Sequence, residues 1–314
     1  MTTFELPLRI GARRSPLAQI QAKLVSDRLR TIHGLLAEEG AVETVLIQTE
    51  GDAVRDRPLS EIGGKGLFTK EIDRALINGR IDVAVHSMKD VPTVLPESLT
   101  IPCLLPREDP RDAWISFSGL SMAALPAGAS VGTSSLRRRA QILARRPDLH
   151  VEPLRGNVET RLKKLNLGEV DATLLAYAGL KRLGQEDVIT EILSSDEMLP
   201  AIAQGAIGAQ CRRADDQVLG FLMPLNHSPT EIAVQAERAF LARLDGSCET
   251  PIAALCTLDG VGGLHLSGLM ATSDGTEVIE GKIEGVHADG RKLGEELGAR
   301  LLARAGPNFL MRKK

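Results

Sequence analysis

The stretch "LRIGARRSPLAQIQAKLVSDRL", residues Leu8 to Leu29, decides the fold class because it combines a strand, a tight turn and a helix. "LRIGA" is short and apolar, as a buried strand is. Ser15 fits the N-cap of a following helix and Pro16 fits its first turn. Apolar residues then recur at helical spacing, namely Leu17, Ile20, Leu24 and Val25. The stretch therefore predicts a strand–turn–helix unit of an α/β protein.

The same alternation continues on the C-terminal side. The strand "VETVLIQT", the helix "GLFTKEIDRALINGR" and the strand "IDVAVHSM" follow in order. After "PREDPRDAW" (Pro106 to Trp114), which reads as a linker, "ASVGT", "HVEPL" and "DATLLAYAGL" are strands separated by helices. Alternating strands and helices predict βαβ units, so we expect two α/β domains with mostly parallel sheets.

The last third of the chain has a different pattern. The capped helix "SPTEIAVQAERAFLARL" precedes three strand-like segments, "IAALCTLDG", "GLHLSGLMAT" and "EVIEGKIEGV", and a closing helix runs from about Arg291 to Arg304. Strands joined by short glycine-containing turns pair antiparallel. We therefore expect a small α+β domain with a three-stranded antiparallel sheet.

Composition narrows the function classes. The 314 residues carry a net charge of −3 and only 3% aromatic residues, which argues against nucleic-acid binding by base stacking. The four cysteines form no C-x-x-C pair and the six histidines have no metal-ligand spacing, so we expect no metal. The N-terminus lacks an apolar leader and no run is long enough to span a membrane. We expect a cytoplasmic protein that binds neither nucleic acid nor membrane.

Basic residues nevertheless cluster in the middle of the chain. Between Gly132 and Lys164 there are nine Lys or Arg residues against three Asp or Glu. In "VGTSSLRRRAQ" the N-caps Ser134 and Ser135 place Arg137, Arg138 and Arg139 in the first helical turn, where the helix dipole already makes cations costly. An anionic ligand would resolve that conflict. Without one the triplet should be electrostatically unfavourable.

Four turns between a strand and the next helix carry basic or hydroxyl groups. Ligands in α/β proteins collect at these carboxyl ends of strands, and Arg with helix N-termini binds carboxylates or phosphates. The turns together predict an anion-binding cleft between two domains, without distinguishing carboxylate from phosphate. Their residues are Arg13, Arg14 and Ser15; Ser87, Lys89 and Asp90; Thr133 to Arg139; and Arg155, Gly156, Asn157 and Arg161.

Three further features have a structural and a functional interpretation. Asp90 is either a turn cap before Pro92 or a carboxylate that pairs with a cation developing on the ligand. "GGKGLF" is a weak match to a phosphate loop, and a lid with Lys65 at its tip fits it better. Cys248 in "LDGSCETP" is either a small buried side chain or a reactive thiolate in an exposed loop. The other cysteines, Cys103, Cys211 and Cys256, lie in apolar contexts and should be structural.

Taken together, the motifs resemble those of the porphobilinogen deaminase (hydroxymethylbilane synthase) family. The likeness covers nearly the whole chain and includes "RIGARRSPLAQIQA", "GGKGLFTKEI", "AVHSMKDVPT", "GTSSLRRRAQ", "LRGNVETRL", "PLNHSPT" and "GSCETPIAA". The resemblance implies a monomeric transferase with three domains, over residues 1–105 with 203–225, 106–202 and 226–314. It further implies that the first two have the fold of type 2 periplasmic binding proteins and enclose the active site.

The resemblance also assigns chemistry. Cys248 would carry a dipyrromethane cofactor through a thioether, and four porphobilinogen units would be added to it with loss of ammonia before hydroxymethylbilane is released. Asp90 would stabilise the azafulvene cation left when ammonia departs. The cofactor-binding set would be Ser87, Lys89, Asp90, Thr133, Ser135, Arg137, Arg138 and Arg155. The substrate-binding set would be Arg13, Ser15, Arg155, Arg161 and Arg182, whereas Arg14 and Arg139 match less restrictive positions.

Some residues depart from the family pattern. Ser247 and Glu249 flank the cysteine where glycine and glutamine are common, and Ala203 stands where glycine is usual, which we expect to be a minor packing change.

We expect Arg137 and Arg138 to face the cleft and Arg139 to turn away. Hinges between the domains are expected near Pro102 to Asp112 and Leu199 to Gly205. A periplasmic-type binding protein and a cytoplasmic regulator that senses an organic acid are the alternatives.

Overall fold

The computed structural model describes residues 5–53, 66–247, 250–306 and 309–311. The chain divides into two compact units. Unit 1 comprises Met1–Val54, Gly64–Arg107 and Ala206–Glu231, and unit 2 comprises Arg55–Gly63, Glu108–Gly205 and Ile232–Lys314. Helix α10 (Ser228–Arg243) begins in the first unit and ends in the second.

Unit 1 is built on a five-stranded sheet in the order β2-β1-β3-β10-β4. Strand β1 runs parallel to β2 and β3, whereas β10 runs antiparallel to β3 and β4. The sheet is therefore mostly parallel in strand direction, as predicted, with β10 running opposite to the other four strands. The sequence analysis did not identify β10 or β4 as strands. The strands are β1 (Leu8–Arg13), β2 (Val42–Ile47), β3 (Val83–Ser87), β4 (Leu99–Leu104) and β10 (Ile207–Arg212).

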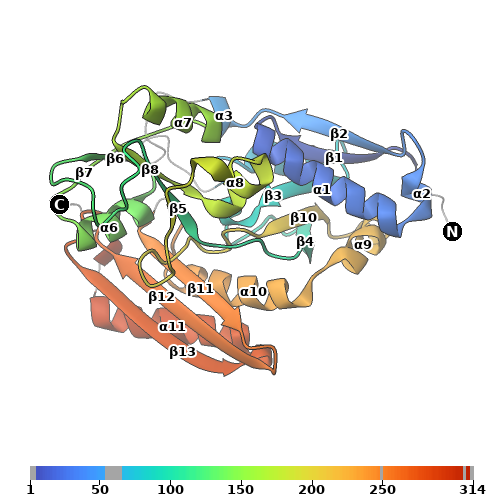
Figure 1. The fold of residues 1–314 in the computed structure, drawn as a ribbon. Coiled ribbons are helices and arrows are strands. Elements are labelled where there is room, and N and C mark those ends of the chain that lie inside the picture. The colour runs from blue at the N-terminus through green and yellow to red at the C-terminus, as the bar shows by residue number, and fades with distance from the viewer. Residues whose placement is uncertain (1–4, 54–65, 248–249, 307–308, 312–314) are drawn as a thin grey trace. The chain divides into compact units, whose positions relative to one another are not determined.

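Helices cover both faces of this sheet (Figure 1). Helix α1 (Pro16–Ile32) and α9 (Asp216–Leu222) pack on one face through Val25, Leu29 and Leu222. On the other face, α5 (Lys70–Ile77) packs through Ile72 and Leu76. Ser15 caps α1 and Pro16 opens it, as predicted. The remaining short elements are α2 (Gly34–Ala37), α3 (Glu50–Ala53), η1 (Met88–Asp90) and η3 (Met223–Leu225).

Unit 2 contains a second five-stranded sheet in the order β7-β6-β8-β5-β9. Its strands follow the same plan, since β6 runs parallel to β7 and β8 and β5 runs antiparallel to β8 and β9. Strand β5 begins at Asp112, inside the segment read from sequence as a linker. The strands are β5 (Asp112–Ser116), β6 (Ser130–Gly132), β7 (His150–Glu152), β8 (Ala172–Ala176) and β9 (Glu191–Ile192).

The helices of this sheet also lie on two faces. Ile142 of α6 (Leu136–Arg145) packs with Trp114 and Val131, whereas Leu162 of α7 and Leu180 of α8 pack with Ile115. Helix α7 spans Val158–Asn166 and α8 spans Tyr177–Leu183, followed by η2 (Glu186–Val188). Every residue of β5 is buried because both faces of the sheet are covered: Trp114 packs on one face, and Ala113 and Ile115 pack on the other.

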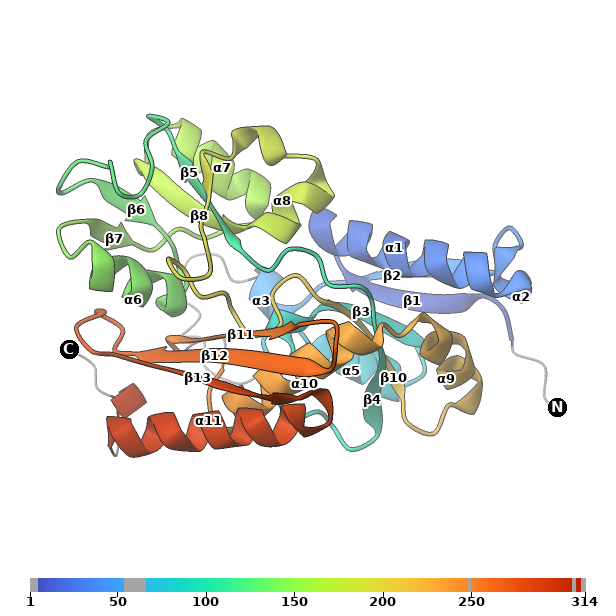
Figure 2. The same cartoon turned by 60° about the horizontal axis from the view of Figure 1, so that its bottom comes forward.

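A third sheet belongs to the same unit. It has the order β11-β12-β13, all antiparallel, as predicted, and α11 runs alongside it (Figure 2). Gly268 of β12 lets the ring of Phe240 on α10 approach, because a Cβ there would lie 2.7 Å from that ring. The elements are β11 (Ile252–Leu258), β12 (Gly263–Ala271), β13 (Val278–Val286), η4 (His287–Asp289), α11 (Gly290–Ala305) and η5 (Phe309–Met311).

The second and third sheets are joined within unit 2 by a small apolar contact. Ala140 of α6 clusters with Ala253, Leu269 and Ala271. At Gly275, a Cβ would lie 2.3 Å from the carbonyl oxygen of Ala140, so only glycine permits this approach. The division of the chain into three domains stays a prediction, since these two sheets form one compact unit.

Candidate active site

In unit 1 the turns after β1 and β3 bring an arginine to a carboxylate. Arg13 Nη1 at the end of β1 lies 3.5 Å from Asp90 Oδ2 in η1, and both side chains keep part of their surface in solvent, 23% and 27%. The guanidinium of Arg13 also stacks over the ring of Phe68, with 4.2 Å between Cζ and the ring centroid. The parallel pairing of β1 with β3 produces this meeting, because it places both strand ends at one edge of the sheet.

The other predicted residues of unit 1 lie in the same two turns. The Ser15 hydroxyl accepts a hydrogen bond from the backbone N–H of Ala18, at 3.4 Å, and so caps α1. Ser87 exchanges hydrogen bonds with the side-chain amide of Gln21 on α1, at 2.8 and 3.1 Å. Lys89 lies beside Asp90 in η1. Both serines therefore orient the site turns on α1, whatever ligand they also contact.

In unit 2 the arginine triplet has a partner inside the protein. Arg137 Nη1 lies 2.8 Å from Asp112 Oδ2, and Arg138 Nη2 lies 2.7 Å from Asp112 Oδ1. All three side chains are buried. The sequence analysis did not foresee this partner: the single negative charge of Asp112, at the start of β5, offsets part of the charge of the triplet. Arg139 has the most exposed side chain of the three arginines.

Backbone carbonyls also hold both arginines, and the expectation that the two face a cleft stays a prediction. Besides the ion pair, Arg137 donates to the carbonyl oxygen of Leu199 at 2.9 Å, and Arg138 donates to that of Leu174 at 2.8 Å. The two guanidiniums hold the pKa of the Asp112 carboxyl well below its ordinary value, against the opposing effect of burial. The carboxylate is therefore ionised across the physiological range.

One carboxylate between two guanidiniums leaves a positive excess at this turn. Among the described residues, Arg137 Nε and Arg155 Nη1 are buried and have no hydrogen-bond partner. Buried donors of this kind are costly unless a partner satisfies them. A ligand that bears carboxylates would supply acceptors for both, so the donor set fits an acidic ligand.

Two further arginines of the predicted substrate-binding set, Arg161 and Arg182, donate to backbone carbonyls. Arg161 Nε donates to Gly156 O at 2.9 Å, and Arg182 Nη2 donates to Gly205 O at 2.7 Å. Burial lowers the pKa of the Arg182 guanidinium from its ordinary value. The backbone N–H of Ser135 donates to Thr133 Oγ1 at 3.2 Å, and Ser135 Oγ accepts from Arg138 N at 3.4 Å as the N-cap of α6.

The segment 199–205 is tied to this cluster. Gln204 Nε2 donates to Asp112 Oδ1 at 2.9 Å, in addition to the Arg137 contact with Leu199. Ala203 has φ +58° and its N–H donates to buried Glu237 Oε2 at 2.6 Å. The substitution of alanine for glycine therefore bears on backbone conformation, and the expected minor packing change stays a prediction. The position needs a left-handed backbone, which glycine adopts at lower cost than alanine.

Several predicted features lie elsewhere or outside the described residues. Cys248 and Lys65 both fall outside them. Cys103, Cys211 and Cys256 are buried, as expected of structural cysteines, and burial raises the pKa of the Cys103 thiol to about 12. The described part of the chain contains no group of three or more His, Cys, Asp or Glu side chains placed to hold a metal ion. Likewise, none of its helices is both long and apolar enough to cross a membrane.

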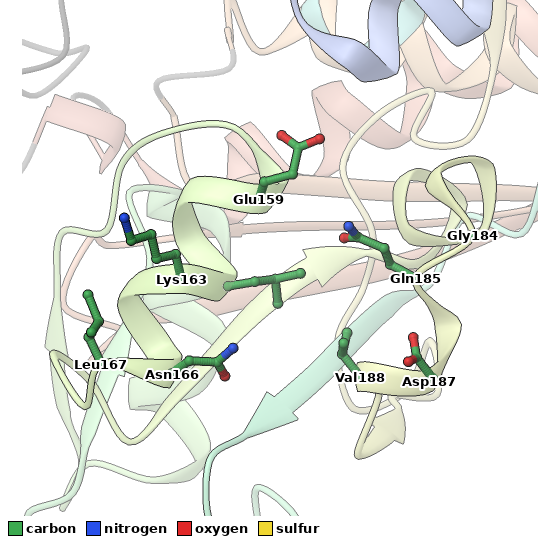
Figure 3. A pocket seen from close by; sticks show the side chains of 9 residues that line it. Glu159, Lys163, Asn166, Leu167, Gly184, Gln185, Asp187 and Val188 are labelled. Carbon is green, nitrogen blue, oxygen red and sulfur yellow. The ribbon is translucent and has the colours of Figure 1, made fainter.

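A surface hollow of about 520 Å³ lies apart from the predicted site residues (Figure 3). It runs along α7 at Glu159 and Lys163 and is closed by Gln185 and Val188 after α8. None of the residues that line it belongs to the predicted cofactor or substrate sets.

The structure adds residues that the sequence reading missed. Asp112 was hidden inside a presumed linker, and only the pairing of β5 with β8 shows that it is buried. Phe68 belongs to "GGKGLF", in which the sequence analysis singled out only Lys65. Gln21 contacts Ser87 from helix α1, and Gln204 contacts Asp112 from the segment 199–205. An aspartate directly before the apolar "AWIS" was the one available signal for Asp112.

Two α/β sheets with the same pattern of parallel and antiparallel pairing each present basic turns at the carboxyl ends of their parallel strands, an arrangement that fits the class of proteins that bind acidic ligands. Comparison with known proteins narrows that class. The family model for "Porphobilinogen deaminase, dipyromethane cofactor binding domain" matches residues 8–220, and that for "Porphobilinogen deaminase, C-terminal domain" matches residues 231–303. The chain belongs to the porphobilinogen deaminase family.

Individual relatives agree. The chain is 56% identical over 305 residues to the chloroplastic porphobilinogen deaminase of Pisum sativum, covering 96% of this chain and 83% of the relative. It is 54% identical over 300 residues to the porphobilinogen deaminase of Nitrobacter winogradskyi, covering 96% and 94%. An ancestral arginine-binding protein bound to arginine is 14% identical, with a TM-score of 0.39 and coverage of 69% and 89%.

Proposed function

We propose that this chain is a transferase that condenses four porphobilinogen molecules head to tail, with loss of ammonia, and releases hydroxymethylbilane. Family membership over most of the chain carries the proposal. The unpartnered arginine nitrogens support it independently, because porphobilinogen carries two carboxylates per pyrrole ring and each added unit brings two more. Arginine is suited to such groups through its planar array of donors.

A dipyrromethane on Cys248 would supply the free α-carbon to which the first substrate unit is joined. The chain's own residues would bind and orient it. Arg137 and Arg155 each have a buried nitrogen without a partner among the described residues, and these would receive carboxylates. Ser87, Lys89, Thr133, Ser135 and Arg138 would complete the cofactor-binding set, and Arg13, Ser15, Arg161 and Arg182 would bind the incoming substrate with Arg155.

Asp90 is the residue proposed to act on the reacting atoms. Its carboxylate lies at a strand end, partly open to solvent, 3.5 Å from the Arg13 guanidinium. A carboxylate in this position can accept hydrogen bonds from pyrrole N–H groups and stabilise the cation formed when ammonia leaves the substrate. Arg13, itself held over Phe68, orients Asp90 and can shift to a substrate carboxylate when one arrives.

The experiment is the intact mass of the denatured protein. We expect the wild-type chain to carry an adduct of two pyrrole units and Cys248→Ser to lack it, with Cys256→Ser as the control that retains it. Incubation with porphobilinogen should then add further units and release ammonia. A wild-type chain without adduct, but with bound organic acid, would support a binding protein instead.

Monomeric state and cytoplasmic location complete the proposal. Sedimentation of the holoprotein and fractionation of the source cells test them. A stable dimer would contradict the proposed monomeric state without affecting the proposed chemistry.

A further inference from the structure

A buried chain of polar side chains crosses unit 1 beneath the proposed catalytic turn. His86 Nε2 on β3 lies 2.7 Å from Gln210 Oε1 on β10. Gln210 Nε2 donates to Asp73 Oδ1 on α5 at 3.0 Å. His86 and Gln210 are 5% and 1% exposed and so are shielded from water, whereas Asp73 is partly buried. None of these residues belongs to the predicted cofactor or substrate sets.

The sheet register explains why these side chains meet. His86 pairs with Gly208 and Ala84 pairs with Gln210, so His86 and Gln210 are diagonal neighbours on one face. That face packs against α5, where Ile72 and Leu76 form an apolar layer with Ala84. The polar chain therefore interrupts an otherwise apolar layer, which makes every unmet hydrogen bond in it costly.

The donor and acceptor roles along this series of hydrogen bonds determine which ring nitrogen of His86 carries the proton. An ionised carboxylate only accepts hydrogen bonds, so Asp73 requires the NH₂ end of Gln210 to face it. The oxygen end of Gln210 then faces His86, and the His86 Nε2 must carry the proton. Burial lowers the pKa of His86 to about 4, so the imidazole is neutral at physiological pH. The distant carboxylate thus selects one neutral tautomer of His86.

Both ends of this series of hydrogen bonds, His86 and Asp73, lie next in sequence to elements of the proposed site. His86 is the residue before Ser87 at the end of β3, and η1 with Lys89 and Asp90 follows directly. It lies close enough to Asp90 and Arg13 to interact electrostatically with both. Asp73 lies in the first turn of α5, which begins just after Phe68. The chain therefore connects the strand that carries Asp90 with the helix that follows the Arg13-stacking ring.

We propose that His86, Gln210 and Asp73 are positioning residues that hold the β3–η1 turn and the start of α5 in register, with His86 fixed as the Nε2–H tautomer. This inference rests on the proposed function for its effect on turnover. The tautomer itself does not depend on that function. The chain acts through the placement of Asp90 and touches no reacting atom.

The tautomer is read directly by NMR of holoprotein labelled with ¹⁵N-histidine, with His86 assigned from the signal lost in His86→Gln. We expect a bare Nδ1 and a protonated Nε2 in the wild type from about pH 8 down to about pH 6, since the ring titrates near 4. In Asp73→Asn, the amide can donate as well as accept, so the signal should shift toward a mixture of tautomers. A wild-type ring protonated on Nδ1 would overturn the proposal.

Kinetics of the same variants test the positioning. Asp73→Asn should lower kcat by about tenfold with KM changed much less, because a small displacement of a catalytic group is costly. The double variant Asp73→Asn with Gln210→Glu restores a chain in which the carboxylate introduced on β10 accepts from both neighbours, and should recover most of that loss. Gln210→Glu alone faces Asp73 with a second carboxylate, so the pair must share a proton and activity should fall as pH rises.

Cys211→Ala is the matched control, since Cys211 follows Gln210 on β10 but its side chain packs in the core on the opposite face. It should leave kcat and the His86 signal unchanged. A folded Asp73→Asn with wild-type kcat, or a double variant no better than the product of the two single variants, would refute the positioning role. Failure of the proposed function would instead appear as a wild type without adduct or turnover, with the tautomer result still standing.

Discussion

The basic turns of the two units have opposite electrostatic designs on the same strand order. In unit 1 one arginine faces one carboxylate at 3.5 Å and both remain partly exposed. In unit 2 two arginines are buried on one carboxylate at 2.7 to 2.8 Å, and a positive excess remains. A balanced, accessible pair suits a carboxylate that must meet a transient cation. A buried positive excess suits the permanent binding of acidic side groups.

The sharpest test of this contrast is Asp90→Ala. We expect kcat to fall at least about a hundredfold, the usual cost of removing one preorganised charge-stabilising group. The thermal midpoint should change little, because Asp90 is partly exposed and its ion pair is long. Ammonia release gives the rate and circular dichroism the fold. The control is Asp27→Ala, which removes an exposed carboxylate paired with Lys23 on α1 and should leave turnover normal. Near-normal rates in Asp90→Ala would show that Asp90 does not stabilise the reacting cation.

The counterpart in unit 2 is Asp112→Asn, whose first effect should be on stability. Removing the charge leaves two buried guanidiniums without compensation, which costs on the order of 3–5 kcal/mol of unfolding free energy. Urea denaturation measures it. Asp148→Asn, which breaks the more exposed pair with Arg146 at 2.6 Å, should cost far less. Equal losses in the two variants would show that burial is not what distinguishes the triplet.

The same residue predicts a pH dependence. Its folded-state pKa is lowered below the ordinary value of 3.8, so Asp112 contributes stability above that value and loses it as pH falls toward the folded-state pKa. Wild type should therefore lose more unfolding free energy than Asp112→Asn between about pH 4 and about pH 2. Parallel stability curves for the two proteins would contradict the buried ion pair.

Cofactor loading should act mainly on the unit with the positive excess. A ligand that binds only the native state stabilises it, so holoprotein should melt above the cofactor-free Cys248→Ser protein. Hydrogen exchange should show the added protection around Arg137 and Arg155, each of which has one buried nitrogen without a partner among the described residues. The control is Cys256→Ser with cofactor bound, and coincident melting of loaded and unloaded protein would contradict a role for these donors.

The smallest expected effect concerns the segment that Arg137 and Gln204 hold. Ala203→Gly should raise the unfolding free energy by up to about 1 kcal/mol, because glycine relieves the left-handed conformation at φ +58° but loses more entropy on folding. Urea midpoints measure the change. The matched control is Ala201→Gly, two residues earlier, which should not raise the unfolding free energy. A clear destabilisation by Ala203→Gly would show that packing of the alanine side chain stabilises the protein.

Prediction from sequence succeeded where local patterns suffice. Ser15 and Pro16 begin α1 as expected, Ser135 caps α6, and the antiparallel sheet of the last third has the predicted three strands. It failed where an element's identity depends on a distant partner. Strands β10 and β5 run antiparallel within their sheets and were missed, because a short apolar run fits a strand or a buried helix equally well.

The candidate site divides in the same way. The sequence by itself determined the α/β class, the basic turns and the family, because caps, turn residues and spacing are local properties of the chain. Only the tertiary structure decided that an internal carboxylate offsets part of the charge of Arg137 and Arg138, since Asp112 lies 26 residues before Arg138 and is placed beside both arginines by the pairing of β5. It also decided that Arg13 meets Asp90 and that His86 faces Gln210. The sign of a charge is written in the sequence, but its free energy depends on burial and on the partner that folding brings to it.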